Sequence, residues 1–395
     1  MLKKATIISF VGISYSSARM LIGAFSVLYL IKKNITIEQI GILKSFQFAV
    51  ILFIDTPLSY LADKYSRKFS IVAAIYAAAT WLLLMGIANS FYMFLLAEFF
   101  NAISLGLMSG TFNAYLYKMK TDQNYGGNAL LVFSRYQKHQ YIAMGVFALI
   151  GSIIYQYADN LVWFLAAAIV LFVGVLAFFM PSDASKISSS KPLGYFFHDL
   201  ILSIIDIVKS NPYRTSAIVI LGVLLQSLIQ FWQIIIKLCD CAALSKIDYA
   251  MIFFIILLAQ SFAGKTIEEI TKKNKKVNVT LFLFISMVLS LSVVYKDIVG
   301  VLIFLFISFY STGIGNTVVS SLFFSSSPES LRGTYVSSVG VLTKLVLFAS
   351  LPLISFIIGR FGIYGFAVFC CTLSFATIFL IRNGEKKLDV VHSEN

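Results

Sequence analysis

Ionisable side chains inside long apolar segments are the residues of this sequence whose types could do chemistry. Arg19 and Lys344 lie near the middle of two such segments, Asp55 lies well inside a third, and Glu98 lies in a fourth. A charge inside a membrane-spanning helix is costly unless it faces water or a partner, so each is a candidate for an ion or substrate pathway. A carboxylate in such a place can carry a proton, because burial favours its neutral form and a nearby base favours its charged form.

Polar residues accompany these charges at helical spacing. Asp55 shares a helix face with Lys44, which we expect to extend to the outer interface. Asn101 follows Glu98 by three residues, and Glu98 is either a substrate contact or half of a structural pair. Arg135 lies early in a fifth apolar segment, where a cavity role and a cytoplasmic helix end both fit.

The segments that position these residues are long enough to cross a membrane. The chain of 395 residues is 59% hydrophobic and 12% charged, with a mean hydropathy of +0.88, as in a multi-pass membrane protein. A span needs about 20 apolar residues. We expect spans at 6–31, 38–62, 69–88, 90–117, 128–157, 160–180, 213–238, 247–268, 277–295, 297–320, 332–358 and 362–382.

The formal charge of +13 reflects topology. Most of the 31 Lys and Arg residues fall in connections on the same side as the N-terminus, which predicts a cytoplasmic location for both termini. We therefore expect no nucleic acid partner. The first apolar run reaches about residue 31 and ends without a small-x-small site, so we interpret it as a span rather than a signal peptide.

A charged connection between the second and third spans carries a specific motif. Residues 59–68 place Asp63 four residues after Ser59, and the bases Arg67 and Lys68 follow. The motif resembles the signature loop of the major facilitator superfamily of secondary transporters, with Ser59 and Ser66 standing where that family usually has glycine. Asp63 can pair with Arg67 one turn on, in a contact that forms in one conformation and breaks in another.

The same spacing occurs again 205 residues further along the chain. Residues 264–273 place Glu268 four residues after Gly264, and Lys272 and Lys273 complete the motif. Repetition at half the chain length indicates two similar halves. The resemblance implies an all-α membrane protein with twelve transmembrane helices in two pseudo-symmetric six-helix bundles. We expect these bundles at 1–180 and 213–382, a cytoplasmic linker with an amphipathic helix at 181–212, and a cytoplasmic tail at 383–395.

The fourth span also resembles an exporter-like branch of that superfamily. The resemblance rests on residues 96–101, then Ser109 and Gly110, then residues 114–117. It implies a proton-coupled transporter that exports a small organic compound, such as an antibiotic, a peptide-like drug or a metabolite, by alternating access. The alternative is proton-coupled uptake of an organic anion or zwitterion. We expect protons, the substrate and the lipid bilayer as partners, and a protein that functions as a monomer.

The second half repeats the polar face without the carboxylate, since Gln260 occupies the position related to Asp55. Asp55 is therefore the leading candidate for the proton-titrating group. The resemblance implies that the predicted pathway residues line a central cavity. They are Arg19, Asp55, Glu98, Asn101, Arg135, Gln226, Gln230, Trp232, Gln260 and Lys344. The predicted conformational-switch residues are Asp63, Arg67, Lys68, Glu268, Lys272 and Lys273.

Other classes fit the sequence less well. Its three histidines are scattered and no two acids in the spans have catalytic spacing, so we expect no enzyme. The absence of a Gly-x-x-x-x-Gly-Lys-[Ser/Thr] loop leaves ATP-driven transport unsupported. We expect no cofactor or metal, and free thiols at Cys239 and Cys241. The predicted location is the plasma membrane, or the inner membrane in a Gram-negative bacterium.

Overall fold

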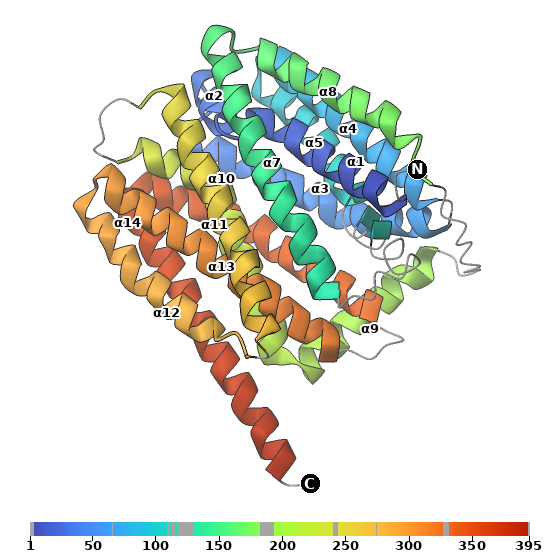
Figure 1. The fold of residues 1–395 in the computed structure, drawn as a ribbon, viewed down its shortest axis with the longest axis vertical. Helices are drawn as coiled ribbons and strands as arrows, with labels where there is room; N and C mark the ends of the chain where they lie inside the picture. Colours follow the sequence, from blue (N-terminus) through green and yellow to red (C-terminus); the bar gives the residue numbers. More distant parts are fainter. Residues whose placement is uncertain are drawn as a thin grey trace. The chain divides into compact units, whose positions relative to one another are not determined.

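The computed structural model describes residues 4–64, 66–108, 111–112, 115–116, 129–181, 193–239, 244–273, 275–326 and 332–393. Over these residues the regular structure is helical throughout (Figure 1). The helices are α1 (Lys4–Arg19), η1 (Met20–Ile22), α2 (Ser26–Lys32), α3 (Ile37–Lys64), α4 (Arg67–Ile87), α5 (Phe91–Met108), α7 (Ala129–Tyr157), α8 (Leu161–Ala177), α9 (Leu193–Ser210), α10 (Pro212–Lys237), α11 (Lys246–Lys272), α12 (Val279–Leu289), η2 (Ser290–Tyr295), α13 (Ile298–Ser326) and α14 (Arg332–Ser393).

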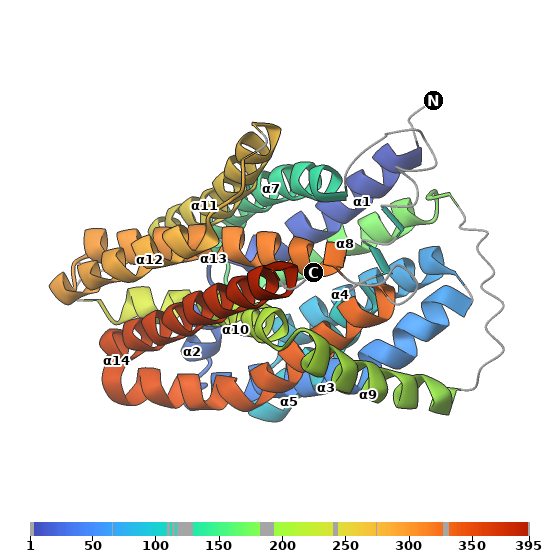
Figure 2. The ribbon, with the colours of Figure 1, turned by 90° about the horizontal axis from the view of Figure 1, so that it is seen from below.

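These helices form two compact units. The first contains Met1–Phe196 and Ala243–Ser261, and the second contains Phe197–Ala242 and Phe262–Asn395. In the first unit α4 packs against α5 and α8, α3 packs against α5, and α1 packs against α7 and α8. In the second unit α10 packs against α13 and α14, and α12 packs against the same two helices, as Figure 2 shows from below. Helix α11 contributes its first part to one unit and its second part to the other.

Nine helical segments within the described residues are long and apolar enough to cross a membrane, and Leu161–Ala177 and Val279–Tyr295 are shorter apolar helices. One of the nine, Ser338–Gly384, contains two expected spans. Gly362 divides it, with φ +61° and ψ −148°, a backbone conformation that favours glycine. With Ser338–Gly384 counted as two and the shorter helices added, the described residues hold the twelve spans that the expected fold class requires, and Gly362 lies where the last two expected spans, 332–358 and 362–382, meet.

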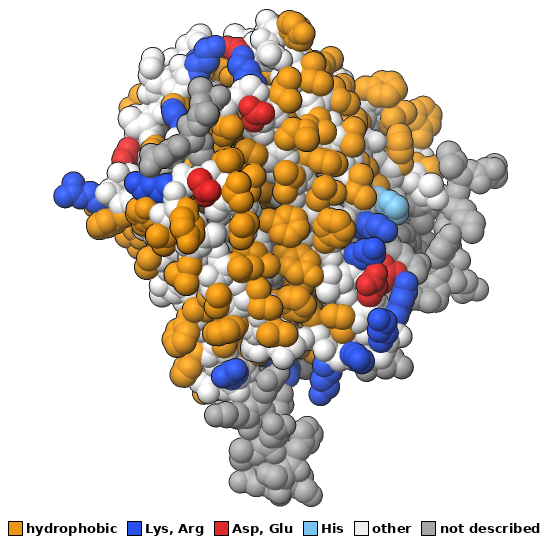
Figure 3. All heavy atoms as spheres, turned by 60° about the vertical axis from the view of Figure 1, so that its left-hand side comes forward, with side chains coloured by type: hydrophobic (Ala, Val, Ile, Leu, Met, Phe, Trp, Pro, Cys, Tyr) orange, Lys and Arg blue, Asp and Glu red, His pale blue; other side chains and the backbone are white. Residues whose placement is uncertain are grey.

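Local sequence signals explain several helix starts. The Ser66 hydroxyl oxygen accepts a hydrogen bond from the Phe69 N–H at 3.4 Å and caps α4, and Asn278 caps α12 through the Leu281 N–H at 3.1 Å. Pro212 occupies the first turn of α10, where its missing N–H costs little. Apolar side chains then decide the packing, and many of them also point outward, which suits contact with lipid. Hydrophobic side chains cover most of the face drawn in Figure 3.

The helix expected between the two bundles is present as α9. Ile207 is buried in an apolar cluster with residues of α10, and the Ser203 and Ser338 hydroxyls share a hydrogen bond of 2.5 Å. Other apolar side chains of α9, including Ile201 and Ile205, are exposed. Its position on a membrane surface stays a prediction.

The expectation of free thiols near the end of α10 is wrong for Cys239, which is disulfide-bonded. Cys370 and Cys371, in α14, are free. No group of three or more His, Cys, Asp and Glu side chains with the arrangement of a metal site occurs among the described residues.

Candidate functional site

The first unit contains a buried network of charged and polar side chains drawn from four helices. Arg19 is the last residue of α1, Lys44 belongs to α3, and Trp81 belongs to α4. Helix α5 supplies Glu98, Asn101 and Ser104, whose spacing of three residues places them along one side of that helix. Glu98, Asn101 and Ser104 are buried, as is Arg19.

The Arg19 guanidinium group lies at the centre of this network. One nitrogen donates to the Tyr15 hydroxyl at 2.8 Å and to the Ser104 hydroxyl at 3.2 Å, and the other donates to Asn101 Oδ1 at 2.5 Å. The guanidinium carbon lies 4.6 Å from the ring centroid of Trp81, within the range of a cation–π interaction. Because the Ser104 hydroxyl donates to the Ala74 carbonyl at 2.7 Å, Tyr15 is the donor in its own 2.6 Å bond to Ser104.

Glu98 forms the other end of the network. Its Oε1 atom lies 2.8 Å from the Lys44 ammonium, and its Oε2 atom accepts a hydrogen bond from Asn101 Nδ2 at 2.9 Å. The side chains of Glu98 and Lys44 are only 2% and 13% exposed. Since an arginine cannot accept and a carboxylate cannot donate, the orientation of the Asn101 amide is fixed by its two partners. Asn101 therefore connects Arg19 to Glu98.

The charges in this network do not cancel. Arg19 and Lys44 are cations and Glu98 is the anion they share, so the three side chains carry one net positive charge when ionised. Both oxygens of Glu98 act as acceptors here, one for Lys44 and one for the Asn101 amide. A proton on Glu98 would place an O–H group beside one of these donors and would remove the negative charge that balances Lys44. The Glu98 carboxylate is therefore the group on which the contacts of both Lys44 and Asn101 depend.

The structure brings three of the predicted pathway residues into this one network: Arg19, Glu98 and Asn101. The interpretation of Lys44 as an interfacial side chain is wrong, because Lys44 turns inward to the buried carboxylate of Glu98. The side chains of Asp55 and Arg135 lie outside the described residues. Sequence reasoning missed Tyr15 and Trp81 as partners of Arg19, although Tyr15 precedes Arg19 by four residues, one helical turn.

The remaining predicted pathway residues lie on other helices. Trp232 is buried in α10, where Gln226 and Gln230 are half-buried. Gln260 is buried on the part of α11 that belongs to the first unit, and Lys344 is half-buried in α14. A role for these side chains in transport stays a prediction.

The two repeated charged connections differ in what the structure describes. In the first, Lys68 donates to the Phe178 carbonyl at 2.6 Å and Arg67 begins α4, whereas the side chain of Asp63 lies outside the described residues. In the second, the Lys272 ammonium lies 2.8 Å from Glu268, one turn earlier on α11, and Lys273 is exposed just beyond that helix.

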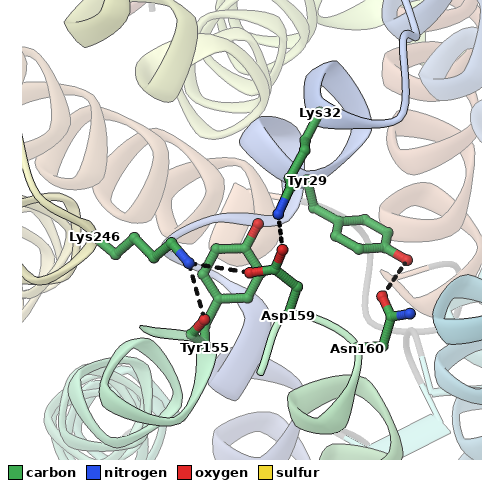
Figure 4. Close-up of polar contacts among 6 residues, drawn as sticks. All are labelled: Tyr29, Lys32, Tyr155, Asp159, Asn160 and Lys246. Carbon is green, nitrogen blue, oxygen red and sulfur yellow. Dashed lines mark hydrogen bonds and ion pairs between the residues drawn. The ribbon is translucent and has the colours of Figure 1, made fainter. Parts of the chain in front are cut away.

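A second charged cluster lies at the turn between α7 and α8, and none of its members is a predicted pathway residue. Asp159 forms ion pairs with Lys32, the last residue of α2, and with Lys246, the first residue of α11 (Figure 4). Each Asp159 oxygen binds one lysine, and the contact to Lys246 is 3.0 Å. Lys246 also donates to the Tyr155 carbonyl at 3.0 Å and lies 4.3 Å from the centroid of the Tyr155 ring.

A cavity of about 450 Å³ adjoins this cluster. Beside Lys32 and Asp159, its lining includes Lys33 and Asn160, and the Tyr29 hydroxyl contacts Asn160 Oδ1 at 3.2 Å. Lys33 donates to Asn89 Oδ1 at 2.8 Å. The turn between α7 and α8 is therefore tied to α2 and to α11, and Lys33, just beyond α2, is tied in turn to the connection between α4 and α5.

Long apolar helices that carry a buried charge network are the features of a multi-pass membrane transporter, and the comparisons agree. Residues 8–351 match the Major Facilitator Superfamily, so the chain belongs to that family. It is a transporter rather than an enzyme. No curated protein sequence matches the chain significantly.

Solved structures share the fold at low sequence identity. The crystal structure of the nucleoside transporter NupG has a TM-score of 0.72 at 15% identity, covering 96% of this chain and 99% of that one. The human organic anion transporter MFSD10 has a TM-score of 0.67 at 14% identity, covering 96% and 98%. A bacterial homologue of the human lysosomal transporter Spinster, inward-facing and occupied, has a TM-score of 0.66 at 13% identity, covering 96% and 94%.

Proposed function

We propose that this transporter is a proton-coupled exporter of a small organic compound and that Glu98 carries a coupling proton. The observation behind the proposal is the buried ion pair between Glu98 and Lys44, linked through Asn101 to Arg19. Ionisable groups inside membrane-embedded bundles are rare because they are costly, and they commonly mark proton or substrate pathways.

Protonation of Glu98 would change its contacts on two sides. A neutral Glu98 no longer balances the Lys44 ammonium, and the new O–H competes with the hydrogen bond donated by Asn101. Asn101 accepts directly from Arg19, so a change at Glu98 reaches the guanidinium through one side chain. Proton uptake would thus alter the charge and the freedom of both cations.

Asp55 remains a second candidate for the coupling proton. It lies on α3, eleven residues after Lys44, and eleven residues are close to three helical turns. The two residues therefore share a helix face. We propose that Asp55 and Glu98 act on the same set of bases.

The net positive charge of the network favours a substrate with an anionic or zwitterionic group, because such a group would neutralise the excess cation. The same observation supports the second candidate function, proton-coupled uptake of an organic anion or zwitterion. Resemblance of the fourth span to exporter-like transporters supports export. We assign substrate contacts on the second half to Gln226, Gln230, Trp232, Gln260 and Lys344, and a cavity role to Arg135.

The charged connections between spans have a separate role in this proposal. The pair of Glu268 and Lys272 on α11, and the predicted pair of Asp63 and Arg67, stabilise one conformational end state, and Lys68 and Lys273 contribute further charge. The protein acts as a monomer in the plasma membrane, with both termini in the cytoplasm.

Proton flux in proteoliposomes tests the proposal. Purified protein is reconstituted with a pH-sensitive dye inside, and nucleosides, organic anions, peptides and antibiotics are added one at a time. We expect a subset of compounds to trigger proton movement in the wild type and not in Glu98→Gln. Opposite movement of proton and labelled substrate indicates export, and movement in the same direction indicates uptake.

Glu38→Gln is the matched control, because Glu38 is an exposed carboxylate at the start of α3 and the substitution removes the same charge. It should leave the flux unchanged. Equal flux in wild type and Glu98→Gln removes Glu98 from coupling, and the same measurement on Asp55→Asn then decides whether Asp55 carries the proton. Substrate transport without any proton movement contradicts proton coupling altogether.

A further inference from the structure

Helix α11 continues without a break from Lys246 to Lys272, although its residues up to Ser261 belong to the first unit and those from Phe262 to the second. The first part of α11 therefore packs with the helices of the first unit, and the second part belongs to the second unit. Contacts that hold this first part decide whether it can separate from the first unit. The cluster around Asp159 lies at its first residue.

We propose that Asp159 is an electrostatic latch for the first part of α11, and that this latch opens and closes during the transport cycle. Asp159 bridges Lys32 of α2 and Lys246 of α11 with separate oxygens. Removing its charge would release both lysines at once. The latch thus depends on one carboxylate in the turn between α7 and α8.

The contact is fixed from several directions. The Tyr155 carbonyl and ring both face the Lys246 ammonium, and the ring stacks on Phe25 with centroids 3.9 Å apart and planes 6° from parallel. Tyr155 is buried, so the surface on which Lys246 rests is held by packing. Lys246 is therefore placed at one position relative to α7.

Below the latch, α11 packs on glycines. A Cβ atom at Gly145 of α7 would lie 2.3 Å from the ring of Phe254, and one at Gly23 would lie 2.8 Å from the ring of Phe253. These ring contacts are close but apolar, and dispersion contacts have little directional preference. The ion pairs at Lys246 supply the directional contact that the glycine packing lacks.

Partial exposure suits a contact that must break repeatedly. The side chains of Asp159 and Lys246 are 25% and 38% exposed, so water can replace each partner when they separate. Glu98 has no such access, because its side chain is 2% exposed. Separation of the Asp159 cluster therefore costs less than separation of the buried pair of Glu98 and Lys44.

Accessibility of a cysteine on α11 tests the latch without substrate or a pH gradient, so the result is independent of proton coupling. Ala250 is fully buried one turn after Lys246. Ala250→Cys is introduced after the free Cys370 and Cys371 are replaced by alanine, and labelling by a membrane-impermeant maleimide is timed. Labelling of the same background without Ala250→Cys is subtracted.

We expect Asp159→Asn to speed the labelling of the introduced cysteine roughly one-and-a-half- to fivefold, the range for a partly exposed ion pair. Lys246→Gln should have a similar effect. The double variant should exceed neither single variant by much, because both remove the same contact. Salt at about 0.5 M screens the ion pairs, so it should raise the labelling rate of the protein that keeps Asp159. The increase should be smaller in Asp159→Asn, which has no such pairs to screen.

Asp248→Asn is the control, since Asp248 is an exposed acid two residues after Lys246 that accepts a hydrogen bond from the Ser245 N–H, which asparagine can also accept. Unchanged labelling in both Asp159→Asn and Lys246→Gln overturns the proposal. The proposal is also overturned if Asp248→Asn raises the labelling rate as much as Asp159→Asn does, because the effect would then be a general one of removing negative charge. If Asp159→Asn does not fold, as judged by gel filtration, Lys246→Gln alone decides between these outcomes.

Discussion

The two halves of the chain differ at the positions that the 205-residue repeat relates. In the first half Arg19, Lys44, Glu98 and Asn101 form a connected charged network. In the second half the related positions are Leu224, Tyr249, Ile303 and Phe306. The helices correspond closely, since α1 to α2, α3 and α5 match α10, α11 and α13 in order and position along the repeat. The backbone pattern is therefore repeated while the charge is not.

This difference indicates where specialised chemistry can be placed in a duplicated fold. Apolar side chains cost least at a buried helix contact, and the second half has buried ones at two related positions, Leu224 for Arg19 and Phe309 for Ser104. A buried ion pair is often neutral or destabilising relative to an apolar replacement. Among the described residues, the positions of the second half that are related to Lys44 and Glu98 are Tyr249 and Ile303, so the ion pair is not a requirement of the repeated fold.

The largest expected effect comes from making the first half resemble the second at one position. Glu98→Leu leaves the Lys44 and Arg19 cations without their shared counter-charge, so we expect a loss of about 3–5 kcal/mol in the free energy of unfolding. Denaturant titration in mixed micelles measures it. Ile303→Leu, at the related position on α13, should change the free energy by less than about 1.5 kcal/mol.

A double variant, Lys44→Met with Glu98→Leu, removes both charges of the pair and leaves uncharged residues at these two positions, as in the second half. Removing both members should recover most of the lost stability, because no unpaired charge from that pair then remains. A double variant as unstable as the sum of the two single variants would show that the charges are not energetically coupled.

A smaller effect is expected at the aromatic side of the network. Trp81→Phe keeps an aromatic ring near Arg19 but weakens the cation–π interaction, so we expect a loss of about 0.5–1 kcal/mol beyond that of the control. Trp163→Phe is the control, since Trp163 packs on Tyr29 and edge-on against Trp81, and no cation lies over its own ring in the described part of the chain. Thermal unfolding in detergent compares the two, and equal losses would contradict a special role for Trp81.

The smallest effect concerns the surface pairs of the second half. Glu268→Gln removes a one-turn pair with the largely exposed Lys272, worth about 0.3–0.5 kcal/mol and reduced by salt. Glu269→Gln, whose pair with Lys265 is 3.8 Å long and more than half exposed on both sides, should change the free energy less. Melting temperatures at low and high salt measure both, and a salt-independent loss in Glu268→Gln would contradict this assignment.

Much of the fold could be predicted because membrane spans are visible in the sequence as long apolar runs. Each span needs one such run, so twelve runs and one repeated loop are enough to recover the arrangement. The break at Gly362 falls where two runs meet. The span expected at 6–31 is found as one segment, Thr6–Lys32, but its internal make-up of α1, η1 and α2 could not be predicted from the apolar run.

The candidate site could be predicted only in part, because partners on different helices have no sequence signal. Arg19, Glu98 and Asn101 stand out by their charge or by their spacing on a single helix. Lys44 is harder to assign because a lysine near a helix end can extend to water or turn inward, and only the position of Glu98 on another helix decides between them. Nothing in the sequence marks Asp159, because a charge in a short turn looks like ordinary surface.

Tryptophan content gives the buried network an optical signal. The chain has three tryptophans, and all three are buried: Trp81, Trp163 and Trp232. The Arg19 guanidinium group lies over the ring of Trp81. In a protein where the other two are replaced by phenylalanine, intrinsic tryptophan fluorescence comes from Trp81 alone, and Arg19 is part of the surroundings that it reports. Any movement of that side chain in a working transporter can then be followed in real time without an added label.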